Sequence, residues 1–551
     1  MAGVPAADLV IRNARVYTLS PAQPWAGAVA CRGGQIAWTG PDRGTGHEEA
    51  ADWAAAARQA GGEVINAGGR VVLPGFIDSH NHVRLGSDTD CAQLTGARSV
   101  AELQARITDW LTAHPGADWI EGEGLDYPAL RPGPDSLDGA AGGRPVFLFD
   151  YSGHAVWVNR AAMQRLGVGA GTGRLPFGVV ERDARGEPTG LLTSFATLGL
   201  AGDGHQALAA VLPWGSPDRR YQRLQRSLAM AIRCGITTIT EPQSGLDDLP
   251  LYQRAQDDGS LRGRLIAALF HPPGASRDLL DRFDAARRRY AGDRLRVAPV
   301  KLYIDDVIER HTAALFEPYA DAPHTSGDTF YDPDEFADLV GELDARRFQV
   351  LIHAIGDRGV HIALNALEHA RRVNGPRDSR HQLVHIELLA SRDLHRFAKL
   401  GVIACMQPRH CAADVGGPEW RAAVGERRWP RAWPVASLHQ AGAPLAFSSD
   451  WNVAEMDPLT GIYTALTRRD LAGGEPFAPA QTIGLQVAIA AYTAGSAYAS
   501  FRERDLGRIT PGRAADLIAV SPDPFGMAPE QIRDCHVDLT IAAGQVCHRT
   551  C

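Results

Sequence analysis

Apolar positions near both ends of the chain form short strand-like runs. These runs are separated by Gly and Asn turns and span residues 8–19, 27–40, 63–75, 505–520 and 537–548. Neither end has enough strands to close a sandwich alone. We therefore expect residues 1–74 and 505–551 to form one composite β-sandwich domain built from both chain termini.

Between these ends, eight apolar runs finish in polar residues, and most precede an amphipathic helical pattern. The runs span residues 71–82, 144–154, 235–243, 297–306, 348–357, 381–387, 401–410 and 444–452. Nearly continuous apolar strands that alternate with helices indicate a parallel sheet covered on both faces, and eight such units close a barrel. The pattern therefore predicts an α/β fold with a (β/α)8 TIM-type barrel over residues 75–504.

The first half of the barrel region contains an insertion. The interval between His82 and Lys301 is much longer than the roughly 90 residues that three barrel units need at about 30 residues each. The excess falls approximately at residues 87–225 and is rich in Gly, Pro and Trp. We expect this insertion to lie near the barrel mouth, where the chemistry of such folds collects.

Composition narrows the function classes. Hydrophobic residues at 45% and charged residues at 22% are typical of a folded globular protein. A net charge of -8 without a basic patch argues against a nucleic-acid partner. The chain shows no signal-peptide pattern and no apolar window of membrane-span length, so we expect no membrane partner, a cytoplasmic location and a small-molecule substrate. We consider a homodimer as its oligomeric state.

The cysteines do not indicate a metal site or a disulfide framework. The eight Cys residues are scattered without CxxC spacing. We therefore expect reduced thiols and neither a zinc ribbon nor a thioredoxin-like site.

The first barrel run ends in two histidines, in "VVLPGFIDSHNH". Side chains alternate along a strand with period two, so His80 and His82 point to the same face. Imidazole is the commonest metal ligand, and two of them fixed by one backbone can hold one ion. A lone HxH is more often a loop without a partner, so the interpretation depends on the other strand ends.

Further metal-ligand types stand at the ends of the fourth, fifth, sixth and eighth runs. In chain order they are Lys301, His353, His385 and Asp450. The carboxyl ends of parallel barrel strands meet on one rim, which predicts that these residues converge. For Lys301 the alternative is a plain salt bridge with Asp305 or Asp306.

Several stretches, spread over nearly the whole chain, match the sequence pattern of a known family. They include "PGFIDSHNH", "GITTITE", "HAIGD", "VHIELL", "SSDWNVAEMDPL" and "GRITPGRAADLIAV". With them the sequence resembles the amidohydrolase superfamily, and specifically amidohydrolase family 3, the YtcJ-like branch that includes an N-substituted formamide deformylase. The resemblance implies two divalent ions, with zinc as the default. One ion would lie on His80, His82 and Asp450, the other on His353 and His385, and Lys301, carboxylated on its amine, would bridge them.

The chemistry of these residue types agrees with that assignment. A protonated lysine would repel two cations, whereas its carbamate is an anionic oxygen donor. Two cations that share a water lower its pKa toward neutrality, and Asp450 can then hold the proton and deliver it to a departing nitrogen.

Other residues at the strand ends are candidates for substrate contacts. His154, at the end of the second run, is a candidate donor to the oxyanion through the N–H of a neutral imidazole, with a helix cap or packing contact as the alternative. Glu241, Gln407 and Trp451 are candidate substrate-binding residues, although a tryptophan in a lid is as often plain packing.

The function expected from this constellation is metal-dependent hydrolysis of a non-peptide carbon–nitrogen bond by an activated hydroxide. The default substrate is an N-formyl or N-acyl amine or a small cyclic amide. The alternatives are a deaminase on the same barrel, a non-catalytic binding protein, and phosphate-ester chemistry.

Two positions depart from the pattern of the relatives. Asp306 follows Asp305 where relatives often carry glycine, and Ser194 stands where they often carry glutamate. Because of Ser194, the resemblance does not determine the substrate.

Overall fold

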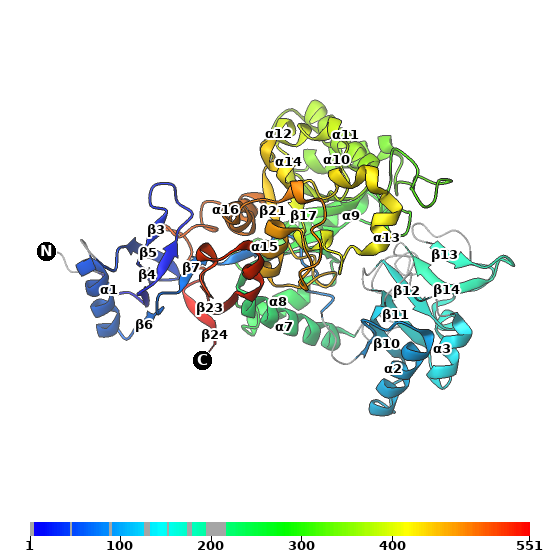
Figure 1. Ribbon diagram of the computed structural model, residues 1–551, viewed down its shortest axis with the longest axis horizontal. Coiled ribbons are helices and arrows are strands. Elements are labelled where there is room, and N and C mark those ends of the chain that lie inside the picture. Colours follow the sequence, from blue (N-terminus) through cyan, green and yellow to red (C-terminus); the bar gives the residue numbers. More distant parts are fainter. Residues whose placement is uncertain are drawn as a thin grey trace.

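A computed structural model describes residues 5–43, 47–86, 91–125, 130, 133–150, 154–172, 179–193 and 216–550 of the chain (Figure 1). Ser194 lies outside these residues. The described strands form four sheets, of which the largest is an eight-stranded barrel at the centre of the molecule. None of the described helices is both long and apolar enough to cross a membrane.

The barrel consists of eight parallel strands that are paired in chain order. They are β8 (Phe76–Asp78), β15 (Ile236–Ser244), β16 (Arg264–Phe270), β17 (Leu295–Tyr303), β18 (Gln349–Ala354), β19 (Gln382–His385), β20 (Ile403–Met406) and β21 (Leu445–Phe447). Backbone hydrogen bonds from Ser79 N to Phe447 O (3.3 Å) and from Asp450 N to His80 O (2.9 Å) join the last strand to the first. The predicted α/β barrel is thereby confirmed.

Amphipathic helices cover the outside of the barrel, so the strands are buried on both faces. The helices are α7 (Pro217–Arg233), α8 (Leu249–Asp257), α9 (Asp278–Arg289), α10 (Pro333–Ala345), α11 (Asp357–Asn374), α12 (Arg396–Leu400), α14 (Val435–Gln440), α15 (Pro458–Thr467), α16 (Leu485–Ala490) and α17 (Ser496–Ala499). A further helix, α13 (Gly417–Val424), belongs to the long connection after β20. One large apolar cluster joins strands and helices into a common core.

One predicted barrel strand is wrong, and one barrel strand was not predicted. The run at 144–154 forms β11 (Val146–Asp150), which lies in a separate sheet, whereas the third barrel strand is β16, with the sequence "RLIAALF". The run at 235–243 is therefore the second barrel strand and not the third. Lys301 remains on the fourth strand because the two errors cancel along the chain.

The segment inserted after β8 forms a sheet of its own in the order β13-β14-β12-β11-β10-β9. Its other strands are β9 (Ala92–Gln93), β10 (Ile120–Leu125), β12 (Ala155–Val158), β13 (Val179–Arg182) and β14 (Pro188–Thr193), with helices α2 (Val100–Ala113), α3 (Pro134–Ala141) and α4 (Arg160–Leu166). An apolar cluster joins Phe147 and Val156 of this sheet to Phe270 and Tyr303 at the carboxyl ends of β16 and β17. The inserted sheet thus lies at the barrel mouth, as expected.

Strands from both chain ends pair with one another at the opposite side of the molecule (Figure 1). A six-stranded sheet has the order β24-β23-β22-β7-β2-β3 and a four-stranded sheet has the order β5-β4-β1-β6. The strands are β1 (Leu9–Arg12), β2 (Arg15–Tyr17), β3 (Trp25–Ala26), β4 (Ala28–Arg32), β5 (Gln35–Gly40), β6 (Glu63–Asn66), β7 (Val71–Pro74), β22 (Leu517–Ser521), β23 (His536–Ala542) and β24 (Gln545–Arg549), with helix α1 (His47–Gln59). Residues of the two sheets share an apolar core, which gives the sandwich-like part expected from the sequence.

Candidate metal centre

Six side chains of metal-ligand type converge at the carboxyl ends of the barrel strands. Lys301 lies on β17, His353 on β18 and His385 at the end of β19, while the other three follow β8 and β21 directly. All six are at most 8% exposed: His80, His82, Lys301, His353, His385 and Asp450. The structure therefore brings together the whole set that the strand ends predicted.

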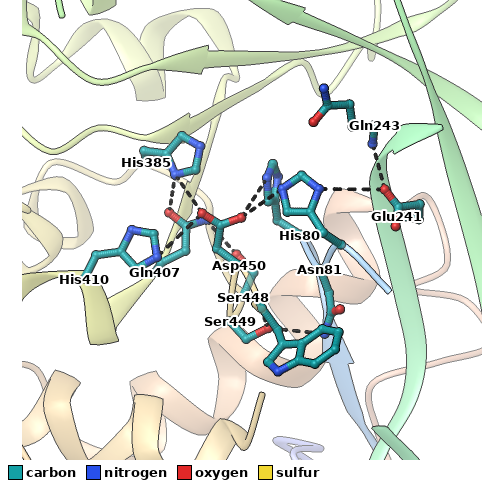
Figure 2. A network of polar contacts seen from close by, with 12 residues as sticks. His80, Asn81, Glu241, Gln243, His385, Gln407, His410, Ser448, Ser449 and Asp450 are labelled. Atoms are coloured by element: carbon teal, nitrogen blue, oxygen red, sulfur yellow. Dashed lines mark hydrogen bonds and ion pairs between the residues drawn. The ribbon is translucent and has the colours of Figure 1, made fainter. Parts of the chain in front are cut away.

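Asp450 lies between two groups of imidazoles (Figure 2). Its Oδ1 is 3.3 Å from His80 Nε2 and 3.2 Å from His82 Nε2, whereas its Oδ2 is 3.7 Å from His385 Nδ1. One potential ligand atom each from His80, His385 and Asp450 lies within 4.8 Å of the others. Asp450 (φ 55°) and His385 (φ 78°) both adopt the left-handed region, a strained conformation that clusters at functional sites.

The hydrogen bonds of the two remaining histidines indicate which ring nitrogen carries the proton. His353 Nε2 is 3.2 Å from the carbonyl oxygen of Asp306, and His385 Nδ1 is 2.9 Å from Gln407 Oε1. Because a carbonyl oxygen only accepts, these contacts assign the proton to His353 Nε2 and to His385 Nδ1. His353 Nδ1 and His385 Nε2 are left with lone pairs for a metal, and the two rings are 4.5 Å apart between centroids.

Gln407, which the sequence made a substrate candidate, holds His385 in place. Its Nε2 donates to Ser448 Oγ at 2.8 Å, so its oxygen faces the imidazole. Hydrogen bonds of this kind orient metal-binding histidines and fix their tautomer.

Glu241 is likewise placed behind a histidine. It accepts hydrogen bonds from the backbone N–H groups of Arg84 and Gln243, both at 3.0 Å, and its Oε1 is 3.9 Å from His82 Nδ1. Burial raises the pKa of this carboxyl group. Glu241 stands on β15, the second barrel strand and not the third, and in this position it faces His82 Nδ1 at a distance too long for a hydrogen bond.

Lys301 has no hydrogen-bond partner for its buried amine among the residues that the structure describes. Its Nζ lies 4.6 Å from the centre of the Tyr303 ring. Burial lowers the pKa of the amine to about 7. The alternative ion pairs are not formed, because Asp305 accepts three backbone N–H groups and Asp306 contacts His154 and Thr312.

The remaining pKa shifts favour the ligand forms of these groups. Burial, reinforced by the charge of Lys301, lowers the pKa of His80 to about 3 and holds that of His353 well below its usual range. Burial and the neighbouring His353 do the same for His385. Burial alone would raise the pKa of Asp450, but the contacts with His80 and His82 hold it well below the usual range. Neutral imidazoles and an ionised carboxylate therefore meet at neutral pH.

These residues fit a divalent metal. Within the described part of the chain, His80 Nδ1 and Nε2, Lys301 Nζ and Asp450 Oδ1 are buried without a hydrogen-bond partner. Buried polar atoms are normally satisfied, and leaving several unsatisfied together is costly. A bound divalent cation would satisfy these nitrogen and oxygen donor atoms.

His154 reaches the centre from outside the barrel. It precedes β12 of the inserted sheet and does not follow a barrel strand, which corrects the predicted position. Its Nδ1 is 2.6 Å from Asp306 Oδ1, and its ring centroid is 5.7 Å from that of His353. Burial lowers its pKa, but the Asp306 carboxylate more than offsets this, so that the pKa of His154 is raised.

Trp451 is buried beside the HxH pair, where its carbonyl oxygen accepts the N–H of His82 at 2.8 Å.

Two further residues at the site were not singled out from the sequence. His410 lies in a short 3-10 turn after β20, with Nε2 3.6 Å from Asp450 Oδ2 and its ring stacked parallel to His385. Glu387 follows β19, with Oε1 3.8 Å from His410 Nδ1. The signal for His410 was available, since it ends the seventh apolar run.

A parallel eight-stranded barrel with four histidines, a lysine and an aspartate at its carboxyl rim defines the class of metal-dependent hydrolases. The model of the "Amidohydrolase family" (Amidohydro_3) matches residues 63–548, and the chain belongs to this family.

Individual proteins agree with the family assignment. The chain is 28% identical to an N-substituted formamide deformylase of Arthrobacter pascens, over 98% of this chain and 97% of the relative. It is 29% identical to protein LONG AFTER FAR-RED 3 of Arabidopsis thaliana, over 94% and 88% of the two chains. An uncharacterized metal-dependent hydrolase from Pyrococcus furiosus superposes with a TM-score of 0.72 at 25% identity, over 94% of this chain and 99% of that structure.

Proposed function

We propose that the chain hydrolyses the carbon–nitrogen bond of a small amide, with an N-formyl or N-acyl amine or a small cyclic amide as substrate. The observation that carries the proposal is the convergence of six buried ligand-type side chains that leave nitrogen and oxygen donors unsatisfied. The similarity to a relative named as a formamide deformylase favours amides as the substrate class.

The donor atoms divide into two sets that would hold two divalent ions, zinc by default. His80 Nε2, His82 Nε2 and Asp450 Oδ1 form one set, and the lone pairs of His353 Nδ1 and His385 Nε2 form the other. Lys301, carboxylated on Nζ, would supply the anionic oxygens between them. The low pKa of its amine supports this role, because only a neutral amine combines with carbon dioxide.

When bound, such ions polarise a substrate carbonyl and lower the pKa of water. Residues of the chain transfer the proton and bind the carbonyl oxygen of the substrate. Asp450 holds a proton on its carboxylate and transfers it to the departing nitrogen. His154, protonated and held by Asp306, presents Nε2–H as a donor to the carbonyl oxygen. This differs from the neutral imidazole expected from the sequence, because the carboxylate partner stabilises the charge.

Lys301, whose amine has no hydrogen-bond partner among the described residues, argues against a deaminase with a single metal, which would need no bridging group. The complete ligand set argues against a non-catalytic binding protein.

The proposal is tested by assaying the zinc-loaded protein against matched N-formyl, N-acetyl and cyclic amides, with metal content measured by mass spectrometry. His80→Ala and His82→Ala should lose at least one ion and the activity, because each removes a ligand. His311→Ala is the matched control, since His311 contacts the exposed Asp321. Full metal content and full turnover in both HxH variants, or no turnover of any amide by the wild type, would contradict the proposal.

A further inference from the structure

The donors of the HxH side come from the two strands that close the barrel. His80 and His82 follow β8, and Asp450 follows β21. Among the described residues, the sheet pairing runs from β21 through the other strands to β8, and it includes no ladder between these two strands themselves. We call this junction the barrel seam. Backbone hydrogen bonds cross it at separate points, such as Asp450 N to His80 O at 2.9 Å, so the spacing of the three donors depends on further contacts between the two loops.

The carboxylate of Asp78 spans the seam and is fully buried. Its Oδ1 accepts the backbone N–H of His80 at 3.3 Å and that of Ser449 at 3.1 Å. Its Oδ2 accepts the side-chain N–H of Asn81 at 2.9 Å and the hydroxyl of Ser449 at 2.6 Å. Each oxygen therefore binds one residue of the loop after β8 and one residue of the loop after β21. We call this set of four hydrogen bonds the seam clamp.

Ser449 connects the clamp to a metal-ligand position. Its Oγ accepts a second hydrogen bond from Asn81 Nδ2 at 3.2 Å and one from the backbone N–H of Trp451 at 3.0 Å (Figure 2). Ser449 directly precedes Asp450, whose backbone adopts the left-handed region at a φ of 55°. Such a conformation persists in a residue other than glycine when the surrounding contacts hold it. The contacts of Ser449 therefore contribute to the direction in which Asp450 points.

We propose that Asp78 is a positioning residue that fixes Asp450 relative to His80 and His82 across the seam, and thereby prepares these donors for a divalent ion. The inference rests on the metal site of the proposed function and adds to it a residue that does not bind the ion itself. An ionised carboxylate suits this role, because it only accepts and offers about four positions, and four donors face it. Groups that hold metal ligands in place typically contribute about 10- to 100-fold to metal affinity.

Zinc affinity tests this role separately from turnover. Asp78→Asn keeps the volume of the side chain, but its NH2 group would face donors, so at least one hydrogen bond of the clamp is lost. Competition with a chelating dye should then give a zinc dissociation constant about 10- to 100-fold above that of the wild type. With cobalt(II) in place of zinc, the visible absorption band at saturation should change, because the donors surround the ion in a different geometry.

Ser449→Ala tests the other end of the clamp. This variant removes the hydroxyl and keeps the backbone N–H that Asp78 Oδ1 accepts. Zinc affinity should therefore fall by a smaller factor than in Asp78→Asn, and the cobalt band should change in the same direction. Because Ser449→Ala places no new donor against the existing ones, it also decides the question if Asp78→Asn does not fold.

Two controls separate positioning from a general loss of stability. Ser79→Ala removes a buried hydroxyl of the same loop, which donates to Ser496 Oγ at 2.8 Å and is not part of the clamp. Arg264→Met breaks the buried ion pair with Asp516 at the start of β16, at the amino end of the barrel strands. Both controls should keep the zinc affinity and the cobalt spectrum of the wild type, although calorimetry should show a lower unfolding temperature for Arg264→Met.

A zinc dissociation constant and a cobalt spectrum like those of the wild type in Asp78→Asn and Ser449→Ala would overturn the inference. An equal loss of affinity in the two controls would overturn it as well, because the effect would then follow stability. Hydrolysis of amides by a protein with either result would leave the proposed function standing. Zinc binding that depends on Asp78, in a protein that hydrolyses no amide, would support the clamp and remove the proposed function.

Discussion

At the scale of single residues, the two oxygens of Asp450 have different neighbours. Oδ1 faces His80 and His82, and Oδ2 faces His385 and His410. One oxygen can therefore stay with a metal while the other handles a proton. This division is what a ligand needs if it is also to act in acid–base catalysis.

Asp450→Asn tests the division of labour. The amide keeps one oxygen for the HxH side but cannot take up a proton, so turnover should fall by a factor of about 10² to 10⁴ while zinc remains bound. The measurements are kcat and the metal content of the same preparation. Near wild-type turnover in a zinc-replete variant would show that another group moves the proton.

The pKa of Lys301 predicts a pH dependence of metal loading. With a pKa of about 7, the amine is protonated below pH 7 and neutral above it, and only the neutral form combines with carbon dioxide. The neutral fraction is about a tenth at pH 6 and about nine tenths at pH 8. At constant dissolved carbon dioxide, uptake of zinc by the metal-free protein should therefore be several-fold greater at pH 8.

His80, with a pKa near 3, does not titrate in this range and cannot cause the difference. Carbon-13 spectroscopy should detect the carbamate in the loaded protein. Lys301→Ala should bind little zinc at either pH. Acetate or propionate should restore part of the zinc binding, because the added carboxylate fills the cavity left by the lysine side chain. Equal loading at both pH values without a carbamate signal would favour a single-metal mechanism.

The sequence was sufficient to predict the six ligand-type residues because each stands at a strand end and the barrel geometry brings strand ends together. It was not sufficient for roles that depend on side-chain direction. Glu241 and Gln407 are at strand ends but turn toward His82 and His385, and nothing in the residue order distinguishes this from facing a substrate. His410 also ends an apolar run, but its contact with Asp450 depends on the turn after β20, which the residue order does not show.

At the scale of elements, seven of the eight predicted runs are barrel strands, and the error has a physical cause. "VFLFD" of β11 and "RLIAALF" of β16 are both continuous apolar runs, so periodicity cannot assign either to a sheet. A chemically active residue at the end of a run favours its assignment as a barrel strand. β16 ends in Phe270, which packs against the inserted sheet, whereas His154 after β11 mimics a strand-end ligand.

The connection after β17 depends on one carboxylate. Asp305 accepts the backbone N–H groups of Ala314, Ile355 and Gly356 at 2.9 to 3.0 Å and is fully buried. It thereby joins the loop after β17 to the end of β18. Asp305, the first member of the Asp305-Asp306 pair, therefore has a structural role.

Asp305→Ala should lower the thermal unfolding temperature by at least about 5 °C, because three buried donors lose their acceptor at about 1–3 kcal/mol each. Differential scanning calorimetry measures the shift. Asp338→Ala, on an exposed helix position, is the control and should change little. A transition within a degree of wild type would mean that the loop finds other acceptors.

At the scale of the whole molecule, the connections between the barrel and the sheet built from both termini include the chain itself and a buried ion pair. β7 continues almost directly into β8, so the chain passes from the sheet into the first barrel strand. Arg264, at the start of β16, forms a buried ion pair with Asp516, just before β22, and Asp516 Oδ1 accepts the N–H of Ala543 at 2.7 Å. The ion pair connects residues far apart in sequence.

Removing one partner of this pair should loosen the terminal sheet from the barrel. Arg264→Met would leave the Asp516 carboxylate, whose pKa burial already raises, without its cation, at a cost of about 3–5 kcal/mol. The unfolding temperature should fall, and limited proteolysis should cut first near β22. In the double variant Arg264→Met/Asp516→Asn the charge of the residue-516 carboxylate is removed as well. Most of the lost stability should therefore be recovered.

The exposed pair of Arg277 with Glu342 provides the control, since surface ion pairs contribute about 0–1 kcal/mol and Arg277→Met should be nearly neutral. If Arg264→Met were as stable as this control, the buried pair would not hold the two parts together. The remaining contacts, which include the apolar ones of Ile518, Val520 and Val537 with the barrel core, would then be sufficient. A loss in Arg264→Met that the double variant does not recover would instead assign the cost to the missing arginine packing, because the charge of Asp516 is absent there.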